Sequence, residues 1–222
     1  MRSYFQAVLW DLDGVIVNSD ALHYESWLAV LPRYGLTISP EMNRRTIGMN
    51  NVKILRIICG DEVSQETIHK IGNAKEAHFR KLVIKGLQPM AGVEDWLKRF
   101  DAWDFKQAIA SSAPLENIKT ILSTLDLTEF FQVIISGQDL PAKPDPAIYL
   151  EAAGRVDVEP RRCIVIEDAL VGVEGALKAG MYVVGVTTTF TAAELNQADR
   201  VVETLDRLEP IDFNQLESRA RG

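Results

Sequence analysis

Two carboxylates one residue apart follow an apolar run near the start of this chain. Residues 7–15 read Ala-Val-Leu-Trp-Asp-Leu-Asp-Gly-Val, so Asp11 and Asp13 come directly after the run. Residues i and i+2 of a strand point the same way, so a strand ending here can aim both acids into one pocket. Buried carboxylates are costly unless a metal ion or a proton sets their charge. The pair therefore suggests chemistry on an anionic substrate with a divalent cation, although a helix start or a surface turn also accommodates Asp-x-Asp.

Three further segments carry polar groups that suit the same chemistry. Ser111 and Ser112 precede a predicted helix, where hydroxyls and free N–H groups can bind an anion or simply cap the helix. Lys143 precedes a proline, which favours an extended backbone and a stiff turn, although a solvated surface lysine is the alternative. Glu167 and Asp168 follow another apolar run, where acids can also complement a helix dipole.

The elements that must position these groups follow from short apolar runs. Such runs predict buried strands at residues 5–10, 105–110, 133–135, 163–166, 182–186 and, weakly, 200–202. Helical patterns lie between most of them, at residues 114–125, 146–153 and 169–179. This alternation predicts an α/β fold with a doubly wound, Rossmann-like parallel sheet. We expect the acids, the serines and the lysine to converge at the carboxyl edge of that sheet.

The segment from 18 to 88 interrupts the alternation, because it contains no convincing strand and several amphipathic helical patterns. Within residues 20–34, apolar side chains recur on one helical face, and residues 18–20 offer N-cap candidates. An insertion directly after the first acids would lie over the edge where ligands bind in open α/β sheets. We therefore expect 18–88 to form an all-helical cap domain, with 1–17 and 89–222 forming the α/β catalytic core.

Convergence of the acids has an electrostatic consequence. Two like charges about 5 Å apart repel by roughly 3 kcal/mol at an effective dielectric near 20. Three or four carboxylates in one pocket therefore require a cation. Ligand sets made only of oxygen favour Mg²⁺, which shares its shell with water and substrate phosphate.

Composition restricts the class of protein. The chain has 222 residues with 47% hydrophobic and 25% charged residues, which is typical of a globular protein. Its net charge of -7 argues against non-specific nucleic-acid binding. Cys59 and Cys163 lack zinc-type spacing and indicate free thiols in a reducing compartment. Without an apolar stretch of about 20 residues or a signal-peptide pattern, we expect no membrane partner and a cytoplasmic location. We expect the protein to be a monomer or a homodimer.

Taken together, and in this order, the four segments resemble the motifs of the haloacid dehalogenase-like hydrolase superfamily. The resemblance covers essentially the whole chain, including a helical cap inserted after the first motif. It is strongest with the beta-phosphoglucomutase and phosphoglycolate phosphatase branches, through Lys-Pro-Asp-Pro at 143–146 and the segment 165–185.

The resemblance implies a mechanism with a covalent intermediate. Asp11 would attack the substrate phosphorus to give an aspartyl-phosphate. Asp13 would protonate the leaving oxygen and later deprotonate the attacking water. This division requires Asp11 to be ionised on Mg²⁺ and Asp13 to be free to hold a proton.

The resemblance also implies the ligands of the metal ion and of the phosphoryl group. The metal would bind the Asp11 carboxylate, the Asp13 backbone carbonyl, and the carboxylates of Asp168 and Glu167. The phosphoryl oxygens would be bound by Ser111, the N–H of Ser112 and Lys143.

Two residues of the predicted cap bear on the reaction type. His23 lies where beta-phosphoglucomutase-like proteins also place a histidine, although it could instead pack as a partly buried helix residue. Those mutases carry an arginine shortly after a cap glycine, whereas Asn51 stands here after Gly48. A neutral amide cannot make a bidentate, charge-assisted phosphate contact, which argues against a mutase.

The sequence therefore predicts a Mg²⁺-dependent phosphatase that acts on a small phosphorylated metabolite. In the family the second acid, here Asp13, is absent from dehalogenases and replaced by alanine in phosphonoacetaldehyde hydrolase, which leaves phosphate-ester chemistry. A beta-phosphoglucomutase-type mutase is one alternative. A non-catalytic binding protein on the same scaffold is the other, although it would not require the intact acids.

Overall fold

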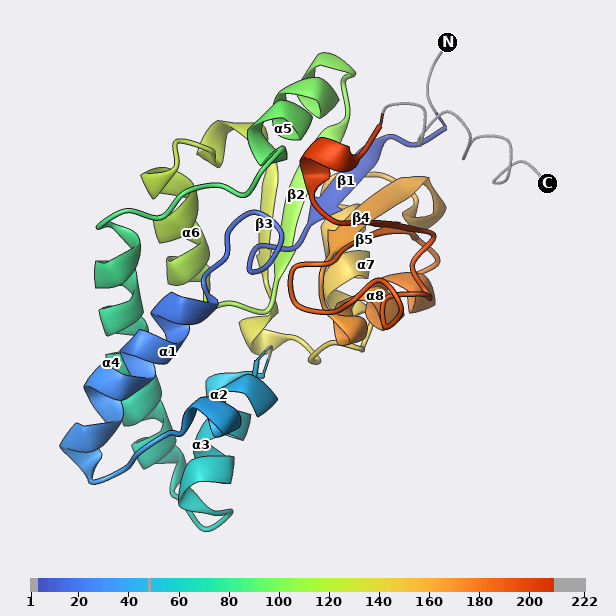
Figure 1. Ribbon diagram of the computed structural model, residues 1–222. Coiled ribbons are helices and arrows are strands. Elements are labelled where there is room, and N and C mark those ends of the chain that lie inside the picture. Colours follow the sequence, from blue (N-terminus) through green and yellow to red (C-terminus); the bar gives the residue numbers. More distant parts are fainter. Residues whose placement is uncertain (1–3, 48, 210–222) are drawn as a thin grey trace.

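The computed structural model describes residues 4–47 and 49–209 and has two parts, a parallel sheet with its helices and a group of helices beside it (Figure 1). Gly48 of the predicted cap, and residues 1–3 and 210–222 of the predicted core, lie outside the described residues. No helix in the described ranges is both long and apolar enough to cross a bilayer.

The sheet has six strands in the order β3-β2-β1-β4-β5-β6, and every neighbouring pair is parallel. The strands are β1 (Ala7–Trp10), β2 (Lys106–Ser111), β3 (Val133–Ser136), β4 (Cys163–Glu167), β5 (Tyr182–Val186) and β6 (Arg200–Val202). The predicted fold class is confirmed, including the weakly indicated last strand. β1 and β4, which are entirely buried, lie side by side in the middle of the sheet.

Helices cover both faces of the sheet because successive strand side chains point to opposite sides. The covering helices are α5 (Val93–Ala102), α6 (Leu115–Thr124), α7 (Ala147–Arg155) and α8 (Leu170–Lys178). Val8 and Trp10 belong to the core cluster that contains α5 and α6 side chains. Ala7 and Leu9 belong to the other cluster, with side chains of α7 and α8.

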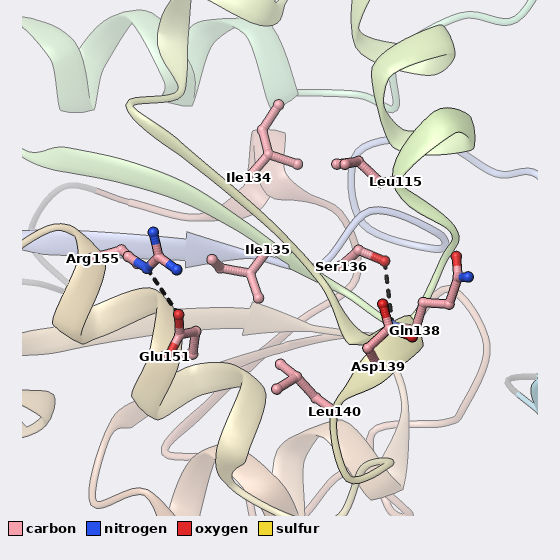
Figure 2. A pocket seen from close by; sticks show the side chains of 9 residues that line it. All are labelled: Leu115, Ile134, Ile135, Ser136, Gln138, Asp139, Leu140, Glu151 and Arg155. Atoms are coloured by element: carbon pink, nitrogen blue, oxygen red, sulfur yellow. Dashed lines mark hydrogen bonds and ion pairs between the residues drawn. The ribbon is translucent and has the colours of Figure 1, made fainter.

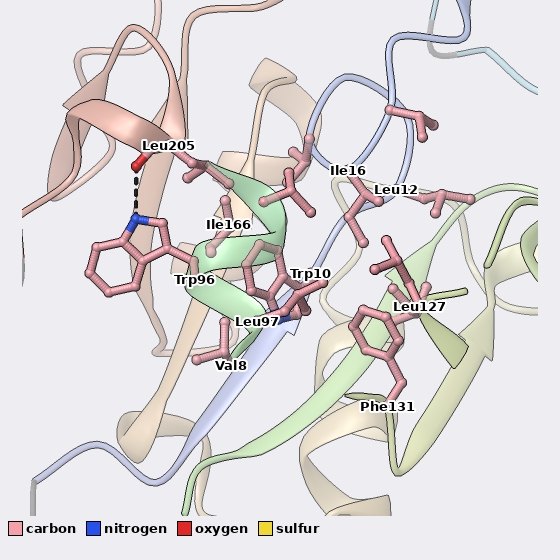
Figure 3. Packing of buried hydrophobic residues seen from close by; sticks show 14 of the residues in the cluster. Val8, Trp10, Leu12, Ile16, Trp96, Leu97, Leu127, Phe131, Ile166 and Leu205 are labelled. Carbon is pink, nitrogen blue, oxygen red and sulfur yellow. Dashed lines mark hydrogen bonds between the residues drawn. The ribbon is translucent and has the colours of Figure 1, made fainter. Parts of the chain in front are cut away.

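A buried tryptophan of the first cluster, Trp96, is hydrogen-bonded to a residue near the end of the described chain. Figure 3 shows Trp96 of α5 beside Val8 and Trp10, with its indole N–H directed at the carbonyl of Leu205. That hydrogen bond measures 2.7 Å and joins residues 109 positions apart. It joins the short 3-10 turn η5 (Leu205–Arg207) to α5.

The helical part occupies the chain between β1 and α5. Its elements are α1 (Asp20–Val30), the 3-10 turn η1 (Leu31–Tyr34), α2 (Pro40–Arg45), α3 (Asn51–Cys59) and α4 (Gln65–Val83). The helical pattern predicted over 20–34 is one α-helix only as far as Val30, since Pro32 cannot donate to the helical ladder. These helices share their own apolar cluster, which includes Trp27, Leu55 and Ile71.

Two adjacent linkers join the helical part to the sheet. Val17 pairs with Pro89 in an antiparallel bridge, and the Met90 N–H donates to the Ile16 carbonyl at 2.8 Å. The carboxyl-terminal part of α4 also enters the core, because Phe79 and Val83 pack in the first cluster of the sheet. The helices are thereby held next to the carboxyl end of β1.

Candidate active site

Three acids meet at the carboxyl ends of the two central strands. Asp11 directly follows β1, while Glu167 ends β4 and Asp168 follows it. One carboxylate oxygen from each lies within 4.8 Å of the others, and all three residues are buried. Gly14 makes room for this group: its φ is 82°, and a Cβ there would stand 1.9 Å from Oδ2 of Asp168. Only glycine tolerates both the backbone angle and the approach.

A single lysine bridges two of these acids. Nζ of Lys143 lies 2.9 Å from Oδ1 of Asp11 and 2.5 Å from Oε1 of Glu167. Its side chain is only 7% exposed. The turn that carries it is fixed locally, because the carboxylate of Asp145 accepts from the N–H of Ala147 at the start of α7. Lys143 is therefore part of the acid group and not a solvated surface lysine.

Glu167 has both of its oxygens engaged by the protein. Oε1 accepts from Lys143 and from the hydroxyl of Tyr149, the latter at 2.9 Å. Oε2 accepts from the N–H groups of Asp168 and Ala169, each at 2.9 Å. α8 fits against this carboxylate only because residue 172 is glycine, where a Cβ would stand 1.9 Å from Oε1. Glu167 thus holds the lysine and the start of the helix in one arrangement.

Negative charge exceeds positive charge in this group. Burial raises the pKa of Asp11 to about 7, with the charge of Lys143 opposing and that of Glu167 reinforcing the rise. Burial likewise raises the pKa of Asp168 to about 8, reinforced by Glu167 and Asp11. Burial lowers the pKa of Lys143, but the two acids outweigh it and hold that pKa well above its usual range. An all-oxygen cluster that is short of positive charge fits a divalent cation.

Asp13 faces a different environment from Asp11. The hydroxyl of Ser19 donates to its Oδ1, and Nε2 of His23 lies 3.7 Å from the same oxygen. Burial raises the pKa of Asp13, but His23, Ser19 and Lys75 outweigh burial and lower it overall. In the protein without a bound cation, the pKa of Asp11 is therefore raised and that of Asp13 is lowered. The reason is that Asp11, Glu167 and Asp168 lie together beside a single lysine, Lys143, whereas Asp13 has Ser19 and His23 beside it and the charge of Lys75 nearby.

Ser19 also differs from its predicted role. It occupies the N-cap position of α1, but its side chain accepts no capping hydrogen bond. Its hydroxyl is used on Asp13 instead. Ser19 therefore stands at the expected cap position, but its side chain binds Asp13 and does not cap the helix.

The two predicted phosphate-binding serines lie at the same edge of the sheet. Ser111 is the last residue of β2, which pairs with β1, and its Oγ accepts from the Ala113 N–H at 3.1 Å. Ser112 follows it and is exposed. Neither serine is among the hydrogen-bond partners of the acid group in the described part of the chain.

The helical part contributes a polar group that the sequence analysis missed. Lys75 of α4 is 3% exposed, and its Nζ lies 2.6 Å from Nδ1 of His23 and 2.9 Å from Oε1 of Glu76. Asn51 does not face the acids through its amide, since Nδ2 donates to the same Glu76 oxygen at 2.7 Å. The available signal was a lysine within the apolar stripe of α4, which is a costly position for an unpaired charge.

A pocket in the described part of the chain is lined by residues other than the acid group. The pocket, of about 400 Å³, opens beside the edge strand β3 and the start of α6 (Figure 2). Its lining consists of Leu115, Ile134, Ile135, Ser136, Gln138, Asp139, Leu140, Glu151 and Arg155. Glu151 and Arg155 pair with each other across one turn of α7 at 2.8 Å, which leaves neither as an isolated charge. None of the predicted site residues lines this pocket.

The parallel sheet and the buried acid–lysine group at its carboxyl edge define the class: an α/β enzyme with its site at the strand ends. The chain belongs to the haloacid dehalogenase-like hydrolase family, whose model matches residues 8–186. The predicted superfamily and its beta-phosphoglucomutase and phosphoglycolate phosphatase branch are thus confirmed. The chain is therefore an enzyme, a hydrolase of the phosphatase type.

The relatives include both phosphatases and a mutase. A "Phosphorylated carbohydrates phosphatase" of Thermotoga maritima is 29% identical over 177 residues, covering 79% of this chain and 82% of the relative. The "Beta-phosphoglucomutase" of Bacillus subtilis is 32% identical over 191 residues, covering 82% and 83%. Among solved structures, a beta-phosphoglucomutase from Clostridium difficile has a TM-score of 0.83 at 25% identity, covering 98% of this chain and 97% of that one.

Proposed function

We propose that this phosphatase hydrolyses a small organic phosphate monoester through an aspartyl-phosphate, with Asp11 as the nucleophile and a bound Mg²⁺. The observation that carries the proposal is the buried acid group in which Lys143 bridges Asp11 and Glu167. The names of several relatives, including the Thermotoga maritima protein, support a phosphorylated carbohydrate as the substrate class.

The acid group supplies the ligands for the cation. Asp11 and Asp168 would bind it through carboxylate oxygens, together with the Asp13 backbone carbonyl. Glu167 contributes charge at the same place, and its hydrogen bonds suit it to holding Lys143. When bound, the cation neutralises the excess negative charge and allows a phosphoryl group to approach Asp11.

The remaining residues act on the phosphoryl group and on protons. Lys143 holds one oxygen of Asp11, so the other oxygen can attack phosphorus in line with the leaving group. Ser111 and the N–H of Ser112 would bind phosphoryl oxygens as charge spreads in transfer. The P–O bond of the ester breaks as the Asp11–phosphorus bond forms, and the leaving oxygen takes a proton.

Asp13 is the proposed donor of that proton and the later base for water. His23 and Ser19 stabilise its ionised carboxylate, which suits Asp13 to act as the base. The incoming phosphate dianion adds a nearby negative charge and so raises the pKa of Asp13, which favours proton uptake on substrate binding. Water then attacks the phosphorus of the aspartyl-phosphate, Asp13 takes the water proton, and inorganic phosphate and free Asp11 result.

We further propose that residues 18–88 act as a cap that excludes bulk water from the intermediate. The helices of this segment stand beside the end of β1, and His23 reaches Asp13 from α1. The two free cysteines, Cys59 and Cys163, are consistent with our proposal of a reducing, cytoplasmic location.

A mutase is the second candidate because the Bacillus subtilis relative carries that name. The hydrogen bond from Asn51 to Glu76 argues against it, since the amide is committed to a carboxylate and offers no cation to a second phosphate. A coupled assay separates the two: a phosphatase releases inorganic phosphate, whereas a mutase interconverts glucose 1-phosphate and glucose 6-phosphate with a bisphosphate activator.

The decisive test is Asp11→Asn, assayed for phosphate release against a panel of sugar phosphates, phosphorylated acids and nucleotides with added Mg²⁺. We expect wild-type turnover on part of the panel and none by the variant, which should still unfold cooperatively in the presence of Mg²⁺. Turnover by a folded Asp11→Asn variant would show that Asp11 is not the nucleophile. A wild-type protein inactive on the whole panel would favour a binding protein.

A further inference from the structure

A buried polar contact joins the helical part of the molecule to the core. Nδ2 of Asn117, on core helix α6, donates to Oε2 of Glu76, on α4, at 2.5 Å. Both residues are buried: Asn117 is completely buried and Glu76 is 7% exposed. Arg80, one turn further along α4, donates to Oδ1 of Asn117 at 2.9 Å. A guanidinium only donates, so this bond fixes the amide with its NH₂ group toward Glu76.

The other oxygen of Glu76 leads toward the site. Oε1 accepts from Lys75 at 2.9 Å and from Asn51 at 2.7 Å. The ammonium group of Lys75 is enclosed by aromatic rings, 5.4 Å from the Trp27 centroid and 5.3 Å from that of Phe79. Cation–π contacts with these two rings therefore hold the ammonium group in place together with its ion pair to Glu76.

Lys75 in turn contacts the histidine that faces Asp13. Its Nζ lies 2.6 Å from Nδ1 of His23, whose ring stacks on Phe79 at 4.0 Å with an interplanar angle of 5°. Nε2 of the same ring lies 3.7 Å from Oδ1 of Asp13. A continuous series of polar contacts thus runs from a core helix, through α4 and α1, back to the core at Asp13.

We propose that Asn117 and Glu76 are positioning residues: they register α4 against the core so that Lys75 and His23 lie correctly against Asp13. This inference rests on the proposed function, in which Asp13 handles the leaving-group proton. Neither residue touches the reacting atoms. A fully satisfied buried network favours one arrangement, because any shift of α4 leaves buried donors and acceptors unpaired.

The matched variants are isosteric. In Asn117→Asp an oxygen replaces the NH₂ group opposite Glu76, so two carboxylates oppose each other while Arg80 keeps its acceptor. Adding Glu76→Gln restores every bond: Gln Oε1 still accepts from Lys75 and Asn51, and Gln Nε2 donates to the new aspartate. The double variant therefore separates loss of the contact from loss of either residue.

The assay compares two phosphate esters. The nitrophenolate of p-nitrophenyl phosphate leaves as an anion, whereas the alkoxide of glycerol 2-phosphate needs a proton from the enzyme. We expect Asn117→Asp to lower kcat for glycerol 2-phosphate about tenfold or more and kcat for p-nitrophenyl phosphate no more than about threefold. The double variant should restore most of the wild-type ratio between the kcat values for the two esters.

A matched control carries the same substitution chemistry elsewhere in the core. Gln107 is completely buried, accepts from the Trp10 indole at 3.2 Å and donates to the Leu97 carbonyl at 3.0 Å. Gln107→Glu should lower the melting temperature but leave the ratio of the two kcat values unchanged. Glu76→Gln alone places two NH₂ groups together without adding charge, and serves if Asn117→Asp does not fold.

Equal slowing of both esters by the folded variants, or a double variant that stays as defective as the single one, would overturn the proposal. A wild-type ratio in Asn117→Asp or Glu76→Gln would do the same. Failure of the proposed function is a distinct result, because it appears as an inactive wild type or an active Asp11→Asn variant.

Discussion

The excess of negative charge around Asp11 predicts an unusual pH dependence of stability for the metal-free protein. The pKa values of Asp11 and Asp168 in the folded protein are about 7 and about 8, against 3.8 for an unperturbed aspartate. The folded protein therefore binds protons more tightly at these carboxyls than the unfolded chain does. This contribution to stability is present at acidic pH and is lost as the pH rises toward 7 and 8.

The size of the effect follows from the same values. Each carboxyl that is protonated only in the folded state costs about 1.4 kcal/mol of unfolding free energy per pH unit. Between about pH 5.5 and the pKa of each group, the unfolding free energy falls by roughly 2 kcal/mol for Asp11 and roughly 3 kcal/mol for Asp168. Because the two share one repulsion, roughly 5 kcal/mol is an upper limit for the sum. The lowered pKa values of Asp13 and Glu76 act at more acidic pH, outside this interval.

The measurement is urea unfolding of the full chain in EDTA at several pH values between about 5.5 and 8.5, repeated with Mg²⁺. We expect the unfolding free energy to fall with pH in EDTA and to be restored by Mg²⁺, most strongly at the alkaline end. Asp168→Asn should flatten the pH dependence and weaken the Mg²⁺ effect. Asp101→Asn, which alters an exposed carboxylate far from the site in sequence, should change neither.

Two results would refute this reasoning. The first is a metal-free protein whose stability is flat or rises over this pH interval, because the acids would then not be short of positive charge. The second is an Asp168→Asn variant that keeps the full pH dependence and the full response to Mg²⁺. Either would remove the electrostatic argument for a cation among these acids.

Three further predictions concern the same group of residues. Gly14→Ala should destabilise the protein by about 1–3 kcal/mol in chemical unfolding and greatly reduce kcat, because its Cβ would displace the Asp168 carboxylate. Tyr149→Phe removes one hydrogen bond from Glu167 and should raise KM up to about tenfold, with a smaller change in kcat; an unchanged KM would show that this bond does not position Lys143. Lys143→Met should lower kcat/KM by about 100-fold or more in steady-state assays, and activity near wild type would exclude it as a phosphoryl ligand.

The sequence by itself determined the sheet and most of what meets at its edge. Apolar runs of strand length separated by helical patterns require a buried parallel sheet, and such a sheet brings its carboxyl ends to one edge. Asp11 and Asp168 directly follow strands and Glu167 ends one, so their meeting is a consequence of topology. Helix boundaries were less certain, since Pro32 ended an amphipathic pattern that continued beyond it.

Only the tertiary structure decided how charge is distributed among those residues. Side chains distant in sequence set the pKa values of the acids. Lys143 contacts Asp11 and Glu167, whereas His23 contacts Asp13 and Lys75 contacts His23. No spacing rule encodes the pairing of Asp13 with His23 and of His23 with Lys75, because these contacts depend on how α1 and α4 pack against each other and against the core. The chain order therefore determined which acids meet, and the packing of α1 and α4 determined which groups lower the pKa of Asp13.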